Sequence, residues 1–292
     1  MTVLISGASG FIAGRCARKL KQESFRIVGI SRRPGPIPGF DVVYPGNLMM
    51  PLGDLFDRES IQTFIHCANH SGKNDFEVNV EGTKLWAEQA AQKGVQLQIF
   101  LSSLSAKEES DSSYARAKFV LERWFLERCH VSLSLGLVIG SGGLFRNMVS
   151  LIKKYPVLPI PDSGKRKVYV TGIDFLCDAI WYIVKSPASK GSGEQWSLFH
   201  PDPVTLKVLL NEIRVQSGSR CVFIPIPSAL ILAAVRVIEH IPFINLSVSR
   251  NNIIGLRQDE LPASESDFAK FDIPGLSLAE LVRKAIERMQ QE

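Results

Sequence analysis

Short apolar segments alternate with helical patterns through the first 140 residues, and this alternation constrains the fold more than any other feature. The expected strands cover residues 3–5, 26–30, 64–67, 98–101 and 132–139, and the expected helices cover residues 10–22, 79–94 and 113–128. Neighbouring parallel strands need a crossover connection, which a helix usually provides. The sequence therefore predicts an α/β fold, in which helices cover both faces of a doubly wound parallel sheet.

The pattern loosens after Gly140, where glycine and proline residues mark loops. Helical patterns return at residues 174–185, 206–217, 228–240 and 278–290. A chain of 292 residues is long for one minimal domain and short for two independent ones. We therefore predict a first domain over residues 1–140, to which residues 167–190 return, and a smaller C-terminal lobe made mainly of residues 141–292.

Charge and cysteine content exclude several classes of protein. The formal net charge of +5 is not gathered into a basic block, so we expect no nucleic-acid binding. The cysteines are widely spaced and lack the close pairs of a zinc site or a redox motif; they are Cys16, Cys67, Cys129, Cys177 and Cys221. We therefore expect no metal site, and reduced thiols that are mostly buried.

The sequence contains no expected membrane span or secretion signal. A strand begins at Thr2, without the basic start and apolar centre of a signal peptide. The longest apolar run, residues 224–235, is shorter than the roughly 20 residues that cross a bilayer. We expect this run to form a buried or amphipathic helix, with peripheral membrane contact as the alternative. The predicted location is cytoplasmic.

A glycine-rich turn follows the first expected strand and reads Gly7-Ala-Ser-Gly10-Phe-Ile-Ala13-Gly14. The first glycine lets the backbone bend sharply, and the second lets it approach a phosphate that meets free N–H groups at the helix start. Ala13 stands where a third glycine is common. Because the turn directly follows a strand, it favours the pyrophosphate of a dinucleotide as its ligand.

The second expected strand ends in Ser31-Arg32-Arg33-Pro34 instead of an acidic residue. An acid at this point would bind the adenosine ribose hydroxyls of NAD, whereas arginines can pair with the additional 2′-phosphate of NADP. This chemistry favours NADP over NAD. The alternative is a solvated basic turn, because arginine is common on protein surfaces.

A serine pair and a tyrosine–lysine pair follow in the same order along the chain. Ser102 and Ser103 end the strand 98–101, and Tyr114-Ala-Arg-Ala-Lys118 opens the next helix. Residues four apart share a helix face, so the phenol and the ammonium can address one ligand. A nearby positive charge is expected to lower the pKa of Tyr114 and make it an acid or base toward a carbonyl or hydroxyl. The alternative is a packed tyrosine beside a solvated lysine.

These motifs, in this order, resemble the extended or atypical short-chain dehydrogenase superfamily, in its NAD(P)-dependent epimerase and dehydratase branch. Residues 64–69 resemble the family's fourth strand, and Val78-Asn79-Val-Glu-Gly82-Thr83 resembles the helix start that follows it. Residues 135–140 and 167–174 resemble the segments that flank the nicotinamide and the substrate phosphates. The resemblance implies a Rossmann-type first domain and a substrate-binding second lobe.

The resemblance also implies a role for individual residues. The implied catalytic residues are Ser103, Tyr114 and Lys118. The implied cofactor contacts are Gly7, Ser9, Gly10, Phe11, Ile12, Arg32, Arg33, Asn47, Leu48, Cys67, Ala68, Asn69, Asn79, Ser102, Tyr114, Lys118 and Leu137. The implied substrate contacts are Ser103, Arg146 and Lys167. Asp54 is the alternative to Asn47 as the adenine contact, and no function is expected for His66, His70 or His200.

The expected activity is hydride transfer to or from a carbinol or ketone carbon of a nucleotide-activated sugar, with NADPH-dependent ketone reduction favoured. Lys167 replaces a common arginine, Leu135-Gly136 replaces a common Arg-Pro, and only ten residues separate Ser103 from Tyr114. These departures favour one alternative, a non-catalytic NADP(H)-binding protein similar to the accessory subunit of respiratory complex I. The apolar run 224–235 suggests a second, a reductase or isomerase of a lipid-like ketone. Relatives often form homodimers, here through helices 79–94 and 113–128.

Overall fold

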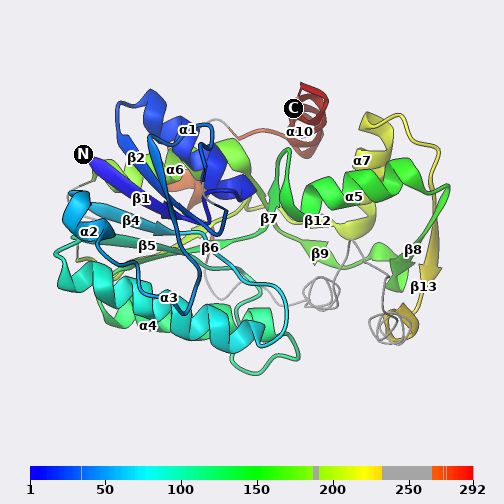
Figure 1. Ribbon diagram of the computed structural model, residues 1–292. Helices are drawn as coiled ribbons and strands as arrows, with labels where there is room; N and C mark the ends of the chain where they lie inside the picture. The colour runs from blue at the N-terminus through cyan, green and yellow to red at the C-terminus, as the bar shows by residue number, and fades with distance from the viewer. Residues whose placement is uncertain (34, 187–190, 232–264, 272, 274, 292) are drawn as a thin grey trace. The chain divides into compact units, whose positions relative to one another are not determined.

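The computed structural model describes residues 1–33, 35–186, 191–231, 265–271, 273 and 275–291 (Figure 1). The chain divides into two units. Unit 1 comprises residues 1–135 and 173–198, and unit 2 comprises residues 136–172 and 199–292. The substrate-binding role of the second lobe stays a prediction.

A parallel sheet forms the centre of unit 1. Its described strands are β1 (Thr2–Ser6), β2 (Arg26–Ser31), β3 (Val42–Pro45), β4 (Thr63–His66), β5 (Leu97–Leu101), β6 (Val131–Leu135) and β11 (Gln195–Leu198), in the spatial order β11-β6-β5-β4-β1-β2-β3. Strand β1 lies between β2 and β4, so the order of the strands reverses at β1. In such sheets, ligands bind outside the carboxyl ends of the strands at this reversal.

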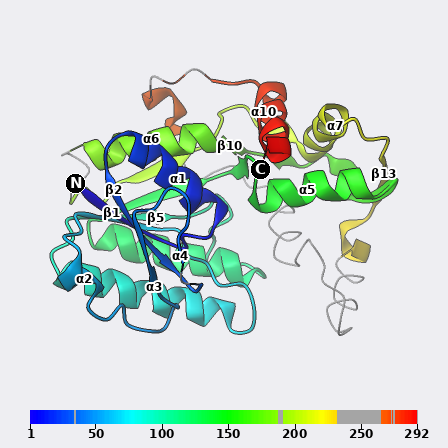
Figure 2. The same ribbon diagram turned by 45° about the horizontal axis from the view of Figure 1, so that its top comes forward.

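Helices cover both faces of this sheet. Helices α1 (Phe11–Gln22) and α6 (Ile173–Lys185) lie on one face, and α3 (Asp75–Gln92) and α4 (Ser113–Glu127) lie on the other (Figures 1 and 2). The short helix α2 (Leu55–Arg58) follows β3 along the chain. This arrangement confirms the predicted α/β fold with a doubly wound parallel sheet.

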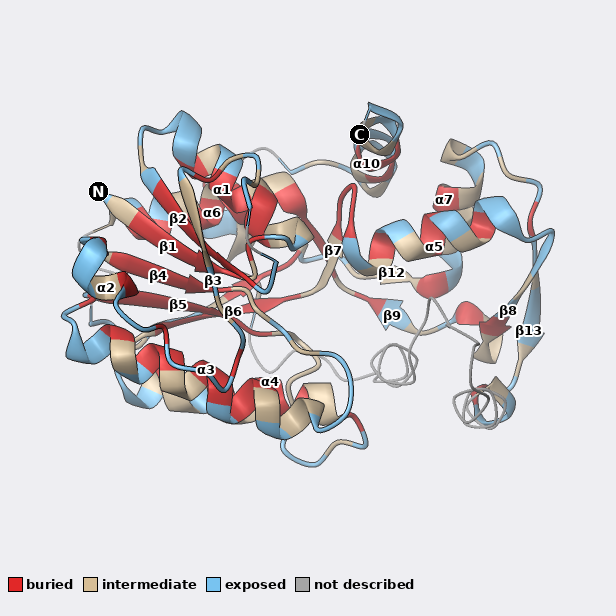
Figure 3. Cartoon of the chain, viewed as in Figure 1, coloured by how far each residue is buried: buried red, intermediate tan, exposed pale blue. Residues whose placement is uncertain are grey.

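The burial of the strands explains why the sequence forms this sheet. Every residue of β4, β5 and β6 is buried, whereas the edge strand β3 is only partly covered (Figure 3). Strands that helices cover on both faces need continuous apolar runs. On one face, Phe64 packs with Trp86 of α3, and Phe100 packs with Phe125 of α4 at a ring-centroid distance of 5.0 Å.

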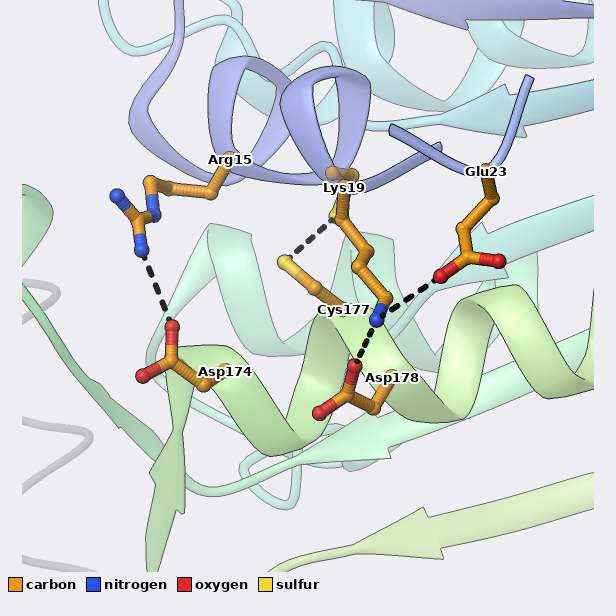
Figure 4. A network of polar contacts seen from close by, with 7 residues as sticks. Arg15, Lys19, Glu23, Asp174, Cys177 and Asp178 are labelled. Atoms are coloured by element: carbon orange, nitrogen blue, oxygen red, sulfur yellow. Dashed lines mark hydrogen bonds and ion pairs between the residues drawn. The ribbon is translucent and has the colours of Figure 1, made fainter. Parts of the chain in front are cut away.

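Side chains of α1 and α6 form a row of contacts between the two helices (Figure 4). Arg15 pairs with Asp174 at 3.1 Å, and Lys19 pairs with Asp178 at 2.8 Å. Between these ion pairs, the buried sulfur atoms of Cys16 and Cys177 lie 3.5 Å apart. The row holds α1, whose first turn follows the glycine-rich segment, against its neighbour on the sheet.

Unit 2 is built from short strand pairs and three described helices. Strand β7 (Leu137–Ile139) pairs with β10 (Val170–Gly172), β8 (Val157–Pro161) with β13 (Val222–Ile226), and β9 (Lys167–Val168) with β12 (Val204–Thr205). The helices are α5 (Gly143–Lys154), α7 (Leu206–Gln216) and α10 (Leu278–Gln291), and the 3₁₀ turns are Asp162–Gly164 and Asp267–Lys270. Phe145, Leu209 and Val282 are fully buried members of its core.

The expected single strand over residues 132–139 is divided at Gly136. A Cβ atom on Gly136 would lie 2.4 Å from the carbonyl oxygen of Tyr169, so only glycine fits this close approach. The Gly136 N–H donates to the Thr171 hydroxyl at 2.9 Å, and the Leu137 N–H donates to the Tyr169 carbonyl at 2.8 Å. The backbone therefore leaves the sheet of unit 1 at this residue and pairs with β10.

The expected helix over residues 224–235 is wrong in its first part. Residues 222–226 form the strand β13, in which Val222 and Ile224 are largely exposed. Pro225 and Pro227 lack the N–H group that a helix interior needs, and β-branched residues favour strands. The remainder of the run from residue 232 lies outside the described residues, as does most of the expected helix 228–240.

No helix in the described part of the chain is long and apolar enough to cross a membrane. The cysteines are all free; Cys16, Cys177 and Cys221 are buried, whereas Cys129 is exposed. No group of three or more potential metal-binding side chains is found among the described residues. Cytoplasmic location and pairing of two chains through α3 and α4 stay predictions.

Candidate functional site

The glycine-rich turn joins β1 to α1 with a geometry that only glycine tolerates. Gly7 has a φ of 69°, and a Cβ atom on it would lie 3.0 Å from the Cα atom of Ala68. The Gly10 N–H donates to the Gly7 carbonyl at 2.7 Å, and α1 begins at Phe11. The turn therefore packs directly against the segment that follows β4.

The start of α1 is suited to an anion. Gly10 is the N-cap residue and has no side chain to cap the helix, and the first turn carries no acidic residue. The first N–H groups of a helix have no partner within the helix and carry partial positive charge. The turn therefore fits the phosphate-binding role that its sequence indicates, with Phe11 and Ile12 supplying N–H groups and Ser9 exposed beside them.

Two side chains fix the segment after β4 next to this turn. The buried Ser6 hydroxyl accepts hydrogen bonds from the N–H groups of Cys67 and Ala68, both at 3.0 Å. The Asn79 carbonyl oxygen accepts from the His70 N–H at 2.7 Å, and its amide nitrogen donates to the carbonyls of His70 at 2.8 Å and Asp75 at 2.6 Å. Both amide protons of Asn79 are therefore used by the protein, and only an acceptor site is left for a ligand.

The basic turn after β2 is exposed. The buried Ser31 hydroxyl accepts from the Arg33 N–H at 3.2 Å, whereas the side chains of Arg32 and Arg33 face solvent. Within the described ranges, neither arginine has a carboxylate partner. Two unpaired guanidinium groups next to the carboxyl end of β2 can bind a phosphate.

The two candidates for an adenine contact have different surroundings. The Gly46 N–H donates to the Ser31 carbonyl at 3.0 Å, so the exposed Asn47 follows directly beside the end of β2. Leu48 is buried against α3, where a Cβ atom on Gly82 would lie 2.7 Å from the Leu48 Cβ. Asp54 pairs instead with Arg58 at 2.6 Å.

The structure brings Ser103, Tyr114 and Lys118 together at the carboxyl end of β5. The Ser112 hydroxyl accepts from the Ala115 N–H at 3.3 Å and caps α4, which begins at Ser113. The Lys118 ammonium donates to the Leu101 carbonyl at 2.6 Å and lies 5.6 Å from the centroid of the Tyr114 ring. Helix α4 thus directs both side chains to the end of this strand.

Burial, and not the nearby charge, controls the pKa values of the pair. Burial raises the pKa of Tyr114, and a hydrogen bond with Ser103 opposes this shift. The predicted lowering of the Tyr114 pKa is therefore wrong, because removing the phenolate from water outweighs any attraction to Lys118. Burial also lowers the pKa of Lys118 to about 8, against the opposing effects of Cys67 and Glu122. At neutral pH the phenol is protonated and the amine largely charged.

Cys67 and Ser102 belong to the same region of unit 1 as Tyr114 and Lys118. Burial raises the pKa of the Cys67 thiol to about 12, although Lys118 opposes the shift, so this thiol is protonated at neutral pH. Ser102 is buried, and its N–H donates to the Leu133 carbonyl at 2.8 Å. Its hydroxyl oxygen has no hydrogen-bond partner within the described ranges. A buried hydroxyl of this kind can bind a ligand at the end of β5.

His66 has the surroundings of a structural residue. Its Nε2 atom lies 2.9 Å from the Gln98 side-chain oxygen, and its ring centroid lies 3.8 Å from that of Phe64, with the two ring planes tilted by 36°. Burial lowers the pKa of His66 to about 3, so the ring is neutral at physiological pH. This environment gives no reason to assign His66 to catalysis.

The other predicted contacts belong to unit 2. Leu137 is half-buried on β7, Lys167 is exposed on β9, and the Arg146 guanidinium donates to the Ser141 carbonyl at 3.3 Å. The roles of these three residues stay predictions. Asn69 is exposed in the segment after β4.

Sequence reasoning missed two hydroxyl groups that organise the site. Ser6, the last residue of β1, holds the segment after β4, and Ser105 contacts the Ser103 hydroxyl at 2.9 Å. Ser6 could have been found as a polar residue at the last position of a buried strand. Ser105 carried no such signal, because serine is common in loops.

Comparisons with known proteins agree with this fold and motif order. Residues 3–198 match the model of the NAD dependent epimerase/dehydratase family. No curated protein matches the chain significantly. Among solved structures, MoeE5 in complex with UDP-glucose and NAD has a TM-score of 0.75 and 18% sequence identity, over 100% of this chain and 99% of that chain.

Two further structures have similar scores. UDP-glucose 4-epimerase with UDP-glucose from Thermotoga maritima has a TM-score of 0.74 and 16% identity, over 100% of this chain and 99% of that chain. TunA, an NAD dependent NDP-hexosamine 5,6-dehydratase involved in tunicamycin biosynthesis, has a TM-score of 0.71 and 16% identity, over 100% of this chain and 98% of that chain. At these identities the likeness shows a common fold.

Proposed function

Because the chain belongs to the NAD dependent epimerase/dehydratase family, we propose that it is an oxidoreductase that acts on a carbinol or ketone carbon of a nucleotide-activated sugar. The observation that carries this proposal is the gathering of Ser103, Tyr114 and Lys118 at the carboxyl end of β5, in the unit that holds the glycine turn. The direction that we propose is reduction of a ketone.

The residues of the site have separate roles in this proposal. A bound nicotinamide dinucleotide supplies hydride chemistry. Tyr114, protonated at neutral pH, donates its phenolic proton to the substrate oxygen, and Ser103 holds that oxygen by a hydrogen bond. Lys118 would bind the cofactor ribose with the ammonium protons that Leu101 does not use. The turn at Gly7 and Gly10 would hold the pyrophosphate, and Ser102 and Asn47 would contact the nicotinamide and adenine ends.

The proposed cofactor is NADP, because Arg32 and Arg33 are exposed and follow a strand that ends without an acidic residue. MoeE5 and TunA are described with NAD, so this preference needs a direct test. Changing Arg32 and Arg33 together to alanine is expected to weaken NADPH binding by about 1.5 to 3 kcal/mol, which is the value of a charge-assisted contact. NADH binding should change little. Cofactor fluorescence titration measures both dissociation constants.

The matched control is Arg123→Ala, which removes an exposed arginine from α4. This variant should bind both cofactors as the wild type does. An equal loss of NADPH and NADH affinity in the Arg32/Arg33 variant would contradict the phosphate role and indicate a general effect on the turn.

The substrate class is tested by thermal unfolding of the complete chain. A ligand that binds only the folded state raises the unfolding temperature. With NADP present, UDP-glucose and related sugar nucleotides are expected to raise it further, whereas free glucose should not. UDP alone separates binding of the nucleotide from binding of the sugar.

One rival function, which is non-catalytic, gives a different result in the same experiment. The segment between Ser103 and Tyr114 is short, which favours a non-catalytic dinucleotide-binding protein. Such a protein would be stabilised by the cofactor and by none of the sugar nucleotides. That outcome would overturn the proposed substrate class.

A further inference from the structure

Strands β8 and β13 of unit 2 form a parallel two-stranded ribbon with two different faces. Side chains alternate between the faces of a strand, and residues that pair across the ribbon share a face. On one face, Leu158, Ile160 and Phe223 pack into the core of unit 2. The outer face carries the pairs Val157 with Val222, Pro159 with Ile224, and Pro161 with Ile226.

This outer face is apolar at every position and is largely exposed (Figure 3). Val157 is 47% exposed, Val222 is 58% exposed and Ile224 is 48% exposed. Parallel strands are normally covered on both faces, and their sequences are then apolar on both. The outer face therefore has the composition of a covered surface. An exposed apolar patch that polar residues border marks an interaction site.

The residues that border the ribbon are mainly basic. The exposed basic residues next to the two strands are Lys153, Lys154, Lys165 and Arg220. Asp162 is the single acidic residue in the sequence of residues 151–166 and 217–231, and it pairs with Arg166 at 3.5 Å. The surface around the apolar face is therefore positively charged and complements an anionic partner.

The chemistry of the ribbon favours a lipid surface over a protein. A further protein strand would need N–H donors at the ribbon edge, and Pro159, Pro161 and Pro225 have none. Protein interfaces are also poor in lysine. At a bilayer surface, aliphatic side chains enter the headgroup boundary while lysines reach anionic headgroups. Tyrosine is enriched at this level, and Tyr155 is exposed with the Lys154 nitrogen 5.2 Å from its ring centroid.

We propose that unit 2 binds the surface of an anionic phospholipid bilayer through the outer face of the β8–β13 ribbon. Val157, Val222 and Ile224 enter the boundary between headgroups and acyl chains, and Lys153 and Lys154 contact the anionic headgroups. The attachment is peripheral, and its strength depends on apolar contact and charge together. It goes beyond the proposed function, since none of these residues belongs to the candidate site.

Co-sedimentation of the complete chain with vesicles tests the apolar part of this surface. The vesicles contain equal parts of phosphatidylglycerol and phosphatidylcholine, or phosphatidylcholine alone. We expect binding to the anionic vesicles, little binding to the neutral ones, and weaker binding as the salt concentration rises. Val222→Ser combined with Ile224→Ser should weaken binding to the anionic vesicles by about tenfold or more, because two aliphatic side chains no longer leave water.

The matched control for this variant is Val208→Ser combined with Val215→Ser. It removes two exposed aliphatic side chains from helix α7 instead of the ribbon and should bind the vesicles as the wild type does. Thermal unfolding without vesicles verifies that both variants are folded, which the exposure of all four side chains favours.

A second pair of variants tests the charge. Lys153→Gln combined with Lys154→Gln should weaken binding by about fivefold for each charge removed, which corresponds to about 1 kcal/mol per lysine near an anionic surface. Lys73→Gln combined with Lys284→Gln changes the net charge of the chain equally at exposed positions away from the ribbon strands. This control should bind as the wild type does.

A tryptophan probe tests contact with the acyl chains directly. Ile224→Trp keeps the outer face apolar and should bind the anionic vesicles at least as tightly as the wild type. With vesicles present, the emission of the added tryptophan should shift to the blue, and lipids brominated in their acyl chains should quench it. The wild-type chain provides the background from its own tryptophans.

The absence of binding to the anionic vesicles, or wild-type binding by the folded Val222→Ser, Ile224→Ser variant, would overturn the proposal. Equal binding to the neutral vesicles would show that the surface does not require anionic lipid, contrary to the proposal. Sedimentation velocity detects the other possible occupant. A dimer that only the serine variant loses, without vesicle binding by either chain, would make the face an interface between two copies.

The outcome is independent of the proposed function. Cofactor and sugar-nucleotide binding are measured without vesicles, so a failure of the lipid experiment leaves the proposed activity untouched. If the vesicle experiments succeed and no sugar nucleotide stabilises the chain, the lipid-binding surface stands and the proposed substrate class fails.

Discussion

Replacing Tyr114 with phenylalanine is expected to lower kcat by about 10²- to 10⁴-fold, which is the usual contribution of a positioned acid or base. Phenylalanine keeps the ring that lies 5.6 Å from the Lys118 nitrogen and removes only the oxygen. The binding of the dinucleotide should change little, because the proposed site of its phosphates is the turn at Gly7 and Gly10. Steady-state kinetics with a sugar nucleotide identified by thermal shift, and cofactor titration, measure the two effects separately.

Tyr155→Phe provides the matched control for this variant. Tyr155 is an exposed tyrosine that follows α5 in unit 2, and the same loss of a hydroxyl there should leave kcat unchanged. Wild-type turnover in Tyr114→Phe would remove the acid from the proposed mechanism. Loss of cofactor binding in the same variant would show that the phenol acts in binding instead.

The sheet could be predicted because each of its central strands is marked by residues that are neighbours in the sequence. Strands β4 and β5 are covered on both faces, so each is a continuous buried run that stands out between helical patterns. The turn from Gly7 to Gly10 was predictable for a similar reason, since a positive φ and a close approach to Ala68 both require glycine. Unit 2 was less predictable, because its strands are short and partly exposed. The apolar run that begins at Ile224 suggested a helix, although the prolines near it oppose one.

The chemistry of the site was less predictable than its residues. The spacing of Tyr114 and Lys118 correctly indicated two residues on one helix face, but the sign of the Tyr114 pKa shift depends on burial, which spacing does not contain. Asn79 is predicted to contact the cofactor, and its amide protons also hold the carbonyls of His70 and Asp75, which the sequence did not indicate. Such hydrogen bonds depend on how loops meet after folding, and no local pattern reports them.

Replacing Lys118 with methionine is expected to remove most of the activity and to make the folded chain more stable. Burial lowers the Lys118 pKa from 10.5 to about 8, so at pH 7 the buried ammonium destabilises the fold by at most ~3 kcal/mol. Methionine is similar in length and carries no charge. It also leaves the Leu101 carbonyl without its donor, at about 1 to 2 kcal/mol. The expected net gain in the free energy of unfolding is about 1 to 2 kcal/mol at pH 7.

The pH dependence of the free energy of unfolding tests this prediction. Between pH 8 and 10.5 the unfolded chain holds the Lys118 proton and the folded chain does not, so the wild-type free energy of unfolding rises with pH in this window. Lys118→Met lacks this group. The amount by which its free energy of unfolding exceeds that of the wild type should therefore decrease from pH 8 to 10.5. Urea unfolding at several pH values measures the difference, with Lys73→Met as the exposed control.

A less stable Lys118→Met at pH 7, or a difference that does not depend on pH, would mean that the ammonium is not destabilising. The prediction that Lys118 lowers stability while it serves activity would then be wrong.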